Sequence, residues 1–157
     1  MSYKLIGGIL ILAAGYGASL ILNARENERA QRLICFCRLL RFFRLQIDCY
    51  CAPIGEIFAK VDKDILRGCG CNAEVSDFEA FLCSLDPPAE GEAGALLRSF
   101  ASELGSGYRE DQLRCCDYHL SMITPLRDAA VSEAARRKKL NTVLCLAAAA
   151  AAVILLI

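Results

Sequence analysis

The stretch LIGGILILAAGYGASLIL, residues 5–22, decides how the fold of this chain is interpreted, because it holds 18 residues without a charge. A second uncharged stretch of 18 residues, LNTVLCLAAAAAAVILLI, occupies residues 140–157. An α-helix rises about 1.5 Å per residue, so each stretch makes a helix of about 27 Å, just long enough to cross a thin hydrocarbon core. We therefore expect two transmembrane helices, at residues 5–22 and 140–157.

Each of these stretches has an alternative interpretation. Lys4 precedes the first apolar run, and Gly15-Tyr16-Gly17 has the small-x-small form of a signal-peptide cleavage site. However, the apolar run continues past this triplet to residue 22 and arginine follows at once, which favours an uncleaved anchor. The second stretch could instead be a buried core helix, but its run of alanines makes it a weak candidate for a packed core.

Basic residues flank both apolar stretches on the side that faces the middle of the chain. They are Arg25, Arg29, Arg32, Arg136, Arg137, Lys138 and Lys139. On the other side of the two stretches the chain carries only Lys4. Because cationic loops resist translocation, this pattern predicts that residues 23–139 stay in the cytoplasm and that both termini lie across the membrane.

The formal net charge of zero conceals an uneven distribution. Residues 25–44 hold six arginines and two glutamates, a balance of +4. Residues 48–133 hold 16 acidic and 7 basic residues, a balance of −9. The basic part is suited to anionic lipid headgroups. The acidic part suits either a basic partner or an ordinary solvated surface.

Between the two stretches the apolar residues recur with helical spacing. Leu33, Phe36, Leu40, Phe43 and Ile47 follow one another at intervals of three and four, which is one face of a helix continuing from residue 22. The run CYCAPIG, residues 49–55, should end this helix, because proline does not continue a helix but suits the first turn of a new one.

Further helices are expected downstream. The apolar spacing predicts a helix over residues 54–65, and Ser76 with Glu79 has the form of a capping box that opens a third. The turn-rich run at residues 86–94 should separate it from a short helix ending at Gly105. A last helix should run through Pro125 into the second apolar stretch. No alternating strand pattern occurs, so the predicted fold is all-α: a membrane-anchored helical bundle between two transmembrane helices.

The segment LGSGYREDQL, residues 104–113, resembles a catalytic loop at first sight. It lacks the glycine–lysine pattern of a phosphate-binding loop and follows no hydrophobic strand. Glu110 and Asp111 would repel an anion, and neighbouring helix positions diverge by about 100°, so they do not form an acid–base pair. Gly107 instead suits a helix N-cap, with the two acidic residues at the positive end of the helix dipole. We therefore expect no catalytic residues and no enzyme.

The chain contains ten cysteines, three pairs of which have C-x-C spacing. Cys49, Cys51, Cys69 and Cys71 are the strongest candidates for a metal-binding or thiol-redox site. Zinc sites more often use C-x2–4-C pairs, cytoplasmic thiols stay reduced, and His119 is the only histidine. We therefore expect small core and surface residues and no metal or other cofactor. A membrane-tethered metal-binding or thiol-redox protein remains the alternative interpretation.

Three segments together resemble one known family. KLIGGILILAAG at residues 4–15, ELGSGYREDQL at residues 103–113 and a C-terminal helix ending VILLI resemble stage III sporulation protein AB, a bacterial membrane protein of endospore formers. The R-E-D-Q run is the most specific of these elements, because apolar ends occur in many membrane proteins. The matched segments occur in the same order and at the same ends of the chain.

This resemblance implies a cytoplasmic helical bundle like that of platform protein F in type II secretion and type IV pilus systems. It also implies a place in the channel complex between mother cell and forespore, in the outer forespore membrane. The bundle would dock the cytosolic, secretion-type ATPase of that complex. No nucleic acid or small-molecule substrate is expected. We assign the docking to Arg109, Glu110, Asp111 and Gln112, for which a capped helix start with local salt bridges is the alternative.

Overall fold

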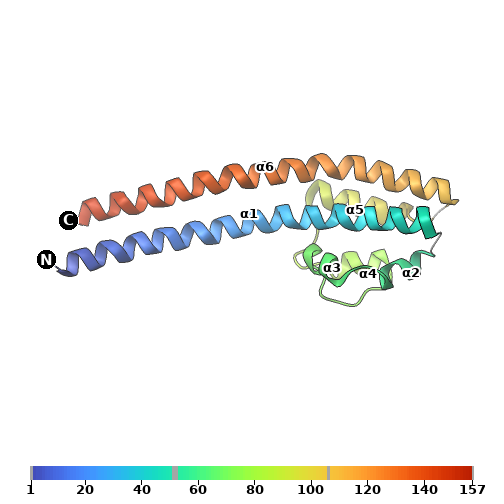
Figure 1. Ribbon diagram of the computed structural model, residues 1–157, viewed down its shortest axis with the longest axis horizontal. Coiled ribbons are helices and arrows are strands. Elements are labelled where there is room, and N and C mark those ends of the chain that lie inside the picture. The colour runs from blue at the N-terminus through green and yellow to red at the C-terminus, as the bar shows by residue number, and fades with distance from the viewer. Residues whose placement is uncertain (1, 51–52, 106, 157) are drawn as a thin grey trace. The chain divides into compact units, whose positions relative to one another are not determined.

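The computed structural model describes residues 2–50, 53–105 and 107–156, with the side chains at 2–6, 8–12, 54, 155 and 156 left outside the description. Six helices follow one another along the chain (Figure 1). They are α1 (Ser2–Tyr50), α2 (Ile54–Ala59), α3 (Lys63–Cys69), α4 (Phe78–Cys83), α5 (Gly91–Glu103) and α6 (Arg109–Leu156). The described residues form no strand, and one isolated bridge pairs Cys71 with Leu85. The all-α prediction is therefore confirmed.

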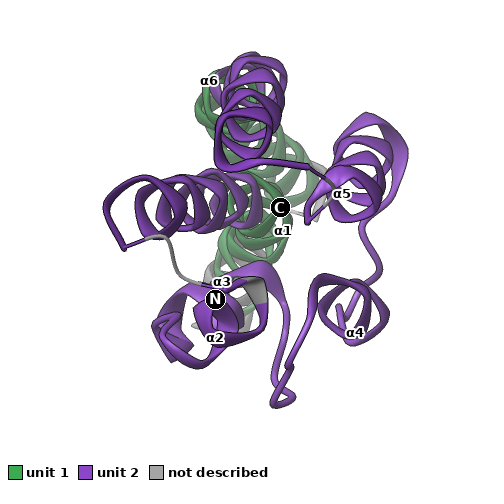
Figure 2. Ribbon diagram, turned by 90° about the vertical axis from the view of Figure 1, so that its right-hand side faces the viewer, with its two compact units in different colours: residues 1–30, 130–157 green, residues 31–129 purple. Residues whose placement is uncertain are grey.

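The chain divides into two compact units, coloured separately in Figure 2. Unit 1 consists of residues 1–30 and 130–157, and unit 2 consists of residues 31–129. The predicted transmembrane stretches belong to unit 1 and fall partly on side chains outside the description. Among the described residues, no helix combines the length and the apolar content that a membrane crossing needs.

The core of unit 2 is built on the apolar face predicted for α1. Leu33, Phe36, Leu40, Phe43 and Ile47 are all buried. Their spacing of three and four places them on one side of the helix, where the short helices cover them. Six phenylalanine rings meet in this core, mostly edge to face, which is a favourable geometry for aromatic pairs. They are Phe36, Phe43, Phe58, Phe78, Phe81 and Phe100.

Two helix starts differ from the prediction because aspartate side chains cap them. The helix expected over residues 54–65 is divided into α2 and α3, since the Asp62 carboxylate accepts a hydrogen bond from the Asp64 amide at 2.9 Å. The N-cap of α4 is Asp77 and not Ser76, because the Asp77 carboxylate accepts from the Ala80 amide at 2.7 Å. This bond lowers the pKa of Asp77. An aspartate that binds amides two or three residues ahead offers the backbone an alternative to a continuing helix.

The remaining helix boundaries shift by smaller amounts. Helix α5 begins at Gly91, inside the segment expected to be a turn, and ends at Glu103, before Gly105. Helix α6 is continuous from Arg109 to Leu156 with Pro125 inside it, as predicted. Tyr108 accepts its first intrahelical bonds, from Asp111 and Gln112, so the cap lies one residue after Gly107.

Candidate functional site

The first of the predicted docking residues, Arg109, binds the end of another helix. Its guanidinium donates to the backbone oxygens of Ile47 at 3.3 Å and Asp48 at 2.6 Å, and to the Asp48 carboxylate at 2.7 Å. The last carbonyls of a helix have no intrahelical donor, so an arginine that reaches them satisfies groups that would otherwise need water. Arg109 therefore joins the end of α1 to the start of α6.

The same carboxylate belongs to a longer chain of charges. Arg44 lies 3.5 Å from Asp48 on its own helix and donates to Asp117 of α6 at 2.6 Å. This bond to Asp117 raises the pKa of the Arg44 guanidinium. We call Arg44, Asp48, Arg109 and Asp117 the α1–α6 clamp, since their alternating charges link the two helices at two points.

Asp111 and Gln112 stabilise the start of α6. The Tyr108 amide donates to the Asp111 carboxylate at 3.3 Å, and the Gln112 amide group donates to the Gly107 carbonyl at 3.3 Å. Asp111 also pairs with Arg114 at 2.7 Å. Gly107 has a φ of +104°, and a Cβ there would approach Asp111 Oδ2 to 3.2 Å. Two of the four predicted docking residues therefore serve the local helix start.

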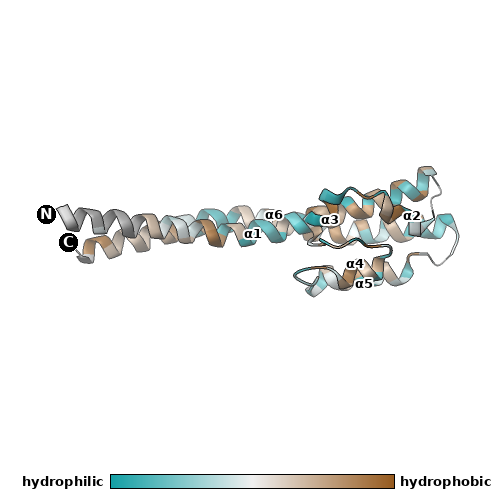
Figure 3. Cartoon of the chain, turned by 90° about the horizontal axis from the view of Figure 1, so that it is seen from below, coloured by the Kyte–Doolittle hydropathy of each residue, from teal (hydrophilic) through white to brown (hydrophobic). Residues whose placement is uncertain are grey.

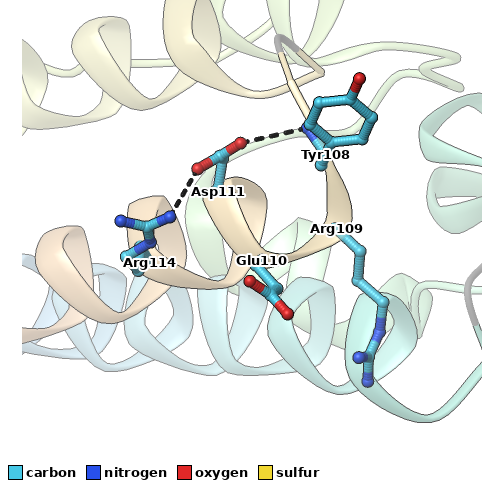
Figure 4. Close-up of a pocket in the computed structure, with 5 residues that line it drawn as sticks. All are labelled: Tyr108, Arg109, Glu110, Asp111 and Arg114. Carbon is cyan, nitrogen blue, oxygen red and sulfur yellow. Dashed lines mark hydrogen bonds and ion pairs between the residues drawn. The ribbon is translucent and has the colours of Figure 1, made fainter.

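What remains exposed at this end of α6 is a small surface of mixed character. Tyr108 is 86% exposed, and Glu110 makes no side-chain hydrogen bond or ion pair with any described residue. Figure 4 shows Asp111 linked to Tyr108 and Arg114, whereas Arg109 extends away from them. These five residues line an open depression. We call Tyr108, Glu110 and Arg114 the α6 surface.

Truncating the clamp should have a small, measurable effect on stability. We expect Arg109→Ala to lower the free energy of unfolding of the full chain by at most about 1 kcal/mol, because exposed ion pairs are weakened by solvent. The side chains of Arg109 and Asp48 are 47% and 39% exposed. Urea denaturation measures the change, with Arg41→Ala, an exposed arginine of α1, as the control. Equal stabilities of the two variants would contradict the clamp.

The predicted cysteine set is divided between core and surface. Cys69 and Cys71 are fully buried, Cys49 is exposed, and Cys51 lies outside the described residues. Burial raises the pKa of the Cys69 thiol, which keeps it protonated at neutral pH. The Cys71 thiol lies 3.0 Å from the Ser84 hydroxyl. The described members of this set therefore occupy different environments.

A different set of metal-type donors comes together elsewhere in unit 2. One oxygen of Glu103, the sulfur of Cys115 and one ring nitrogen of His119 all lie within 4.8 Å of one another. His119 is 1% exposed, so it belongs to the core of unit 2. Burial and the carboxylate of Glu103 raise the pKa of Cys115 to about 11. The spacing of four between Cys115 and His119, which places both on one helix face, was the available signal in the sequence.

In unit 1, α1 and α6 meet along small and polar residues. A Cβ on Gly15 would lie 2.8 Å from the Ala149 Cβ and 3.1 Å from the Cys145 carbonyl oxygen. Ser19 is 1% exposed and donates to the Tyr16 carbonyl at 2.8 Å. Gly15 on α1 therefore faces Cys145 and Ala149 on α6, and the buried Ser19 lies one turn further along α1. We call this line of contact the unit 1 seam.

The seam continues toward its charged end through hydrogen bonds. Asn141 donates to the Asn23 side chain at 3.2 Å, and Asn23 donates to Thr142 at 3.4 Å. Arg137 pairs with Glu26 at 2.7 Å. Two helices that present small and amide side chains to each other approach closely and bond across the contact.

Most of the large apolar side chains that the structure describes in unit 1 lie on its outside. They are Tyr16, Leu20, Ile21, Leu22, Val131, Leu140, Val143, Leu144, Leu146 and Ile154. Figure 3 shows apolar residues at the C-terminal end of α6 and polar ones toward its middle. Unit 2 differs, because its apolar core is buried and includes the phenylalanine cluster and the apolar face of α1.

The chain matches no family model, no curated protein and no solved structure with which it was compared.

Proposed function

We propose that this chain is a non-enzymatic membrane platform protein. Unit 1 is a two-span anchor, comprising the stretches at residues 5–22 and 140–157, and unit 2 is a cytoplasmic bundle that docks a protein partner. The observation that carries the proposal is the reversed packing of unit 1, with small residues in the seam and large apolar residues outside.

The reversed packing favours lipid over water as the surroundings of unit 1. In water, an antiparallel pair of helices gains its stability by burying large apolar side chains. Here Ile21, Val143 and Leu144 are 63%, 65% and 65% exposed, while Gly15 and Ala149 fill the contact. In lipid, exposed apolar side chains cost nothing, and helices associate by close packing of small residues and by bonds between polar side chains.

The basic residues beside the apolar segments support the proposed orientation. Arg25, Arg29, Arg136, Lys138 and Lys139 are all exposed. They suit the anionic headgroups of a cytoplasmic leaflet. In this orientation unit 2 lies in the cytoplasm and both termini lie on the opposite side of the membrane.

The resemblance to stage III sporulation protein AB suggests the identity of the partner. In this proposal the chain belongs to the sporulation channel complex in the outer forespore membrane, with the cytosolic secretion-type ATPase as the docked partner. Of the four residues assigned to docking, Glu110 alone makes no side-chain hydrogen bond or ion pair with the described part of the chain. The α6 surface therefore takes the place of Arg109, Asp111 and Gln112 as the proposed contact.

Thiol labelling tests the orientation. Cys83 is exposed on unit 2, whereas the buried Cys69 would not report its compartment. An impermeant maleimide should leave Cys83 unlabelled in intact cells. The same reagent should label Cys83 once the cells are permeabilised. Cys49→Ser removes the other thiol of unit 2 that is exposed among the described residues. Ser2→Cys supplies a position that should be labelled in intact cells. Labelling of Cys83 in intact cells would rule out a cytoplasmic unit 2.

Charge reversal tests the docking surface. We expect Glu110→Lys to abolish co-purification of the ATPase without a large loss of stability. Glu92→Lys is the matched control, because Glu92 is also exposed in the first turn of its helix. Reversing the charge of either residue loses the same interaction with the helix dipole, about 0.3–1 kcal/mol. If both variants retain the ATPase equally, the α6 surface is not the docking site.

A further inference from the structure

We propose that Glu103, Cys115 and His119 form a binding site for Zn²⁺ or a related transition-metal ion. The site lies in unit 2, where the end of α5 meets the beginning of α6. It shares no residue with the C-x-C pairs, and it adds a bound metal to the proposed platform function without depending on it.

Two of the three distances between the donors match those of zinc ligands, and the third is at most 4.8 Å. Cys115 Sγ lies 3.6 Å from His119 Nδ1 and 3.7 Å from Glu103 Oε2. Zinc bonds of about 2.3 Å to sulfur and about 2.0–2.2 Å to nitrogen or oxygen, at a tetrahedral angle, place two ligand atoms roughly 3.5 Å apart. An ion among these three atoms would therefore need only small side-chain movements.

The surrounding residues hold the donors in place. Cys115 and His119 lie one turn apart on α6, and the imidazole packs against Phe100 at 5.3 Å and Tyr118 at 5.1 Å between ring centroids. The other oxygen of the Glu103 carboxylate accepts from the Ser99 hydroxyl at 2.7 Å. Such a bond to a ligand's second oxygen is typical of the outer shell of metal sites.

The donor set selects the class of metal. Thiolate and imidazole favour Zn²⁺ and its neighbours over Ca²⁺ and Mg²⁺, which prefer oxygen ligands. On binding, the Cys115 thiol releases its proton to solvent and the thiolate bonds the metal. His119 gives up its 2.9 Å contact between Nδ1 and the Cys115 carbonyl and carries its proton on Nε2. Thiolate, carboxylate and Zn²⁺ then sum to zero charge, which suits a half-buried position.

Three protein ligands leave one position of a tetrahedral ion open, to be filled by water or a fourth ligand. Because the ligands come from two helices, the bound ion would join the end of α5 to α6. The alternative is that the three groups interact through weak hydrogen bonds alone. The two readings differ in whether a metal bonds the Cys115 sulfur.

Cobalt spectroscopy of the full chain, kept reduced, tests the proposal. Co²⁺ should produce a near-ultraviolet thiolate-to-cobalt band that saturates at one equivalent per chain, and Zn²⁺ should remove it. Cys115→Ser should abolish the band, whereas Cys83→Ser, which removes an exposed thiol of α4, should leave it unchanged. Absence of a band in the unaltered chain, or its persistence in Cys115→Ser, would overturn the proposal.

A second variant keeps the test decisive if Cys115→Ser folds poorly. Ser99→Ala leaves all three ligands in place but removes the hydrogen bond to Glu103, so Zn²⁺ should bind roughly tenfold more weakly. Zn²⁺ should also raise the thermal unfolding midpoint of the unaltered chain more than that of Ser99→Ala at equal concentration. Identical affinities and identical midpoint shifts would exclude Glu103 as a ligand and overturn the three-residue site.

Discussion

Phe43→Ala is expected to lower the free energy of unfolding of unit 2 by about 3–5 kcal/mol, the range for truncating a buried aromatic side chain. Phe43 is 0% exposed. Its ring centroid lies 5.0 Å from that of Phe58, 5.3 Å from Phe78 and 6.4 Å from Phe100. One side chain of α1 thus contacts α2, α4 and α5, and its removal leaves a cavity among rigid rings that collapse only in part.

The neighbouring phenylalanine provides the control. Phe42 is only half-buried, so Phe42→Ala should cost less, under about 2 kcal/mol. Hydrogen exchange of the α4 and α5 amides, followed by mass spectrometry, reports the opening of unit 2 separately from unit 1. Equal losses of protection in the two variants would mean that the aromatic cluster is not the centre of the core.

The sequence predicted the main features of unit 2 because its largest helix has a regular pattern. The spacing of Leu33, Phe36, Leu40, Phe43 and Ile47 is a local property, and it was enough to identify the buried face of α1. The continuity of α6 through Pro125 followed from a similar pattern. Both predictions depend on residues close together in the chain, where periodicity is informative.

Short helices were harder to place, because single side chains decide where they begin. Asp62 and Asp77 each capture a backbone amide and set the first residue of a helix. Ser76 and Asp77 are both acceptable caps, and the sequence does not show which one will accept the bond. The break between α2 and α3 was missed for the same reason.

The site residues were only partly predictable, because their partners are distant in the sequence. The bond between Arg109 and Asp48 joins residues 61 apart, and no local pattern reveals it. Glu103 and His119 meet because α5 packs beside the start of α6. Two interpretations were open for the run at residues 109–112: the docking of a protein partner or the capping of a helix start. The contacts of these residues show that three of the four have structural roles within unit 2, whereas Glu110 makes no side-chain hydrogen bond or ion pair with the described residues.

Gly15→Leu is expected to destabilise the unit 1 seam by about 1–3 kcal/mol, the usual cost of forcing extra atoms into a filled contact. Even the first added carbon would meet Ala149 at 2.8 Å and the Cys145 carbonyl oxygen at 3.1 Å. The Cys145 carbonyl oxygen belongs to the backbone of α6, so it cannot move away by a change of rotamer as a flexible side chain could. The two helices must therefore move apart, which weakens the bonds of Asn23 with Asn141 and Thr142.

Gly17→Leu separates this effect from a general effect of leucine, since a Cβ on Gly17 meets nothing within 4 Å. Helices persist in sodium dodecyl sulfate, so circular dichroism would not detect their separation. Energy transfer between dyes at the exposed positions Ala13 and Ala151 would detect it during a titration of detergent-solubilised protein with that surfactant. In the Gly15→Leu variant, α1 and α6 should separate at a lower surfactant concentration than in the unaltered chain. In the Gly17→Leu variant, they should separate at the same concentration as in the unaltered chain. If the two variants behave alike, close packing of small residues does not hold the hairpin together. The exposed apolar side chains of unit 1 would then need an explanation other than lipid.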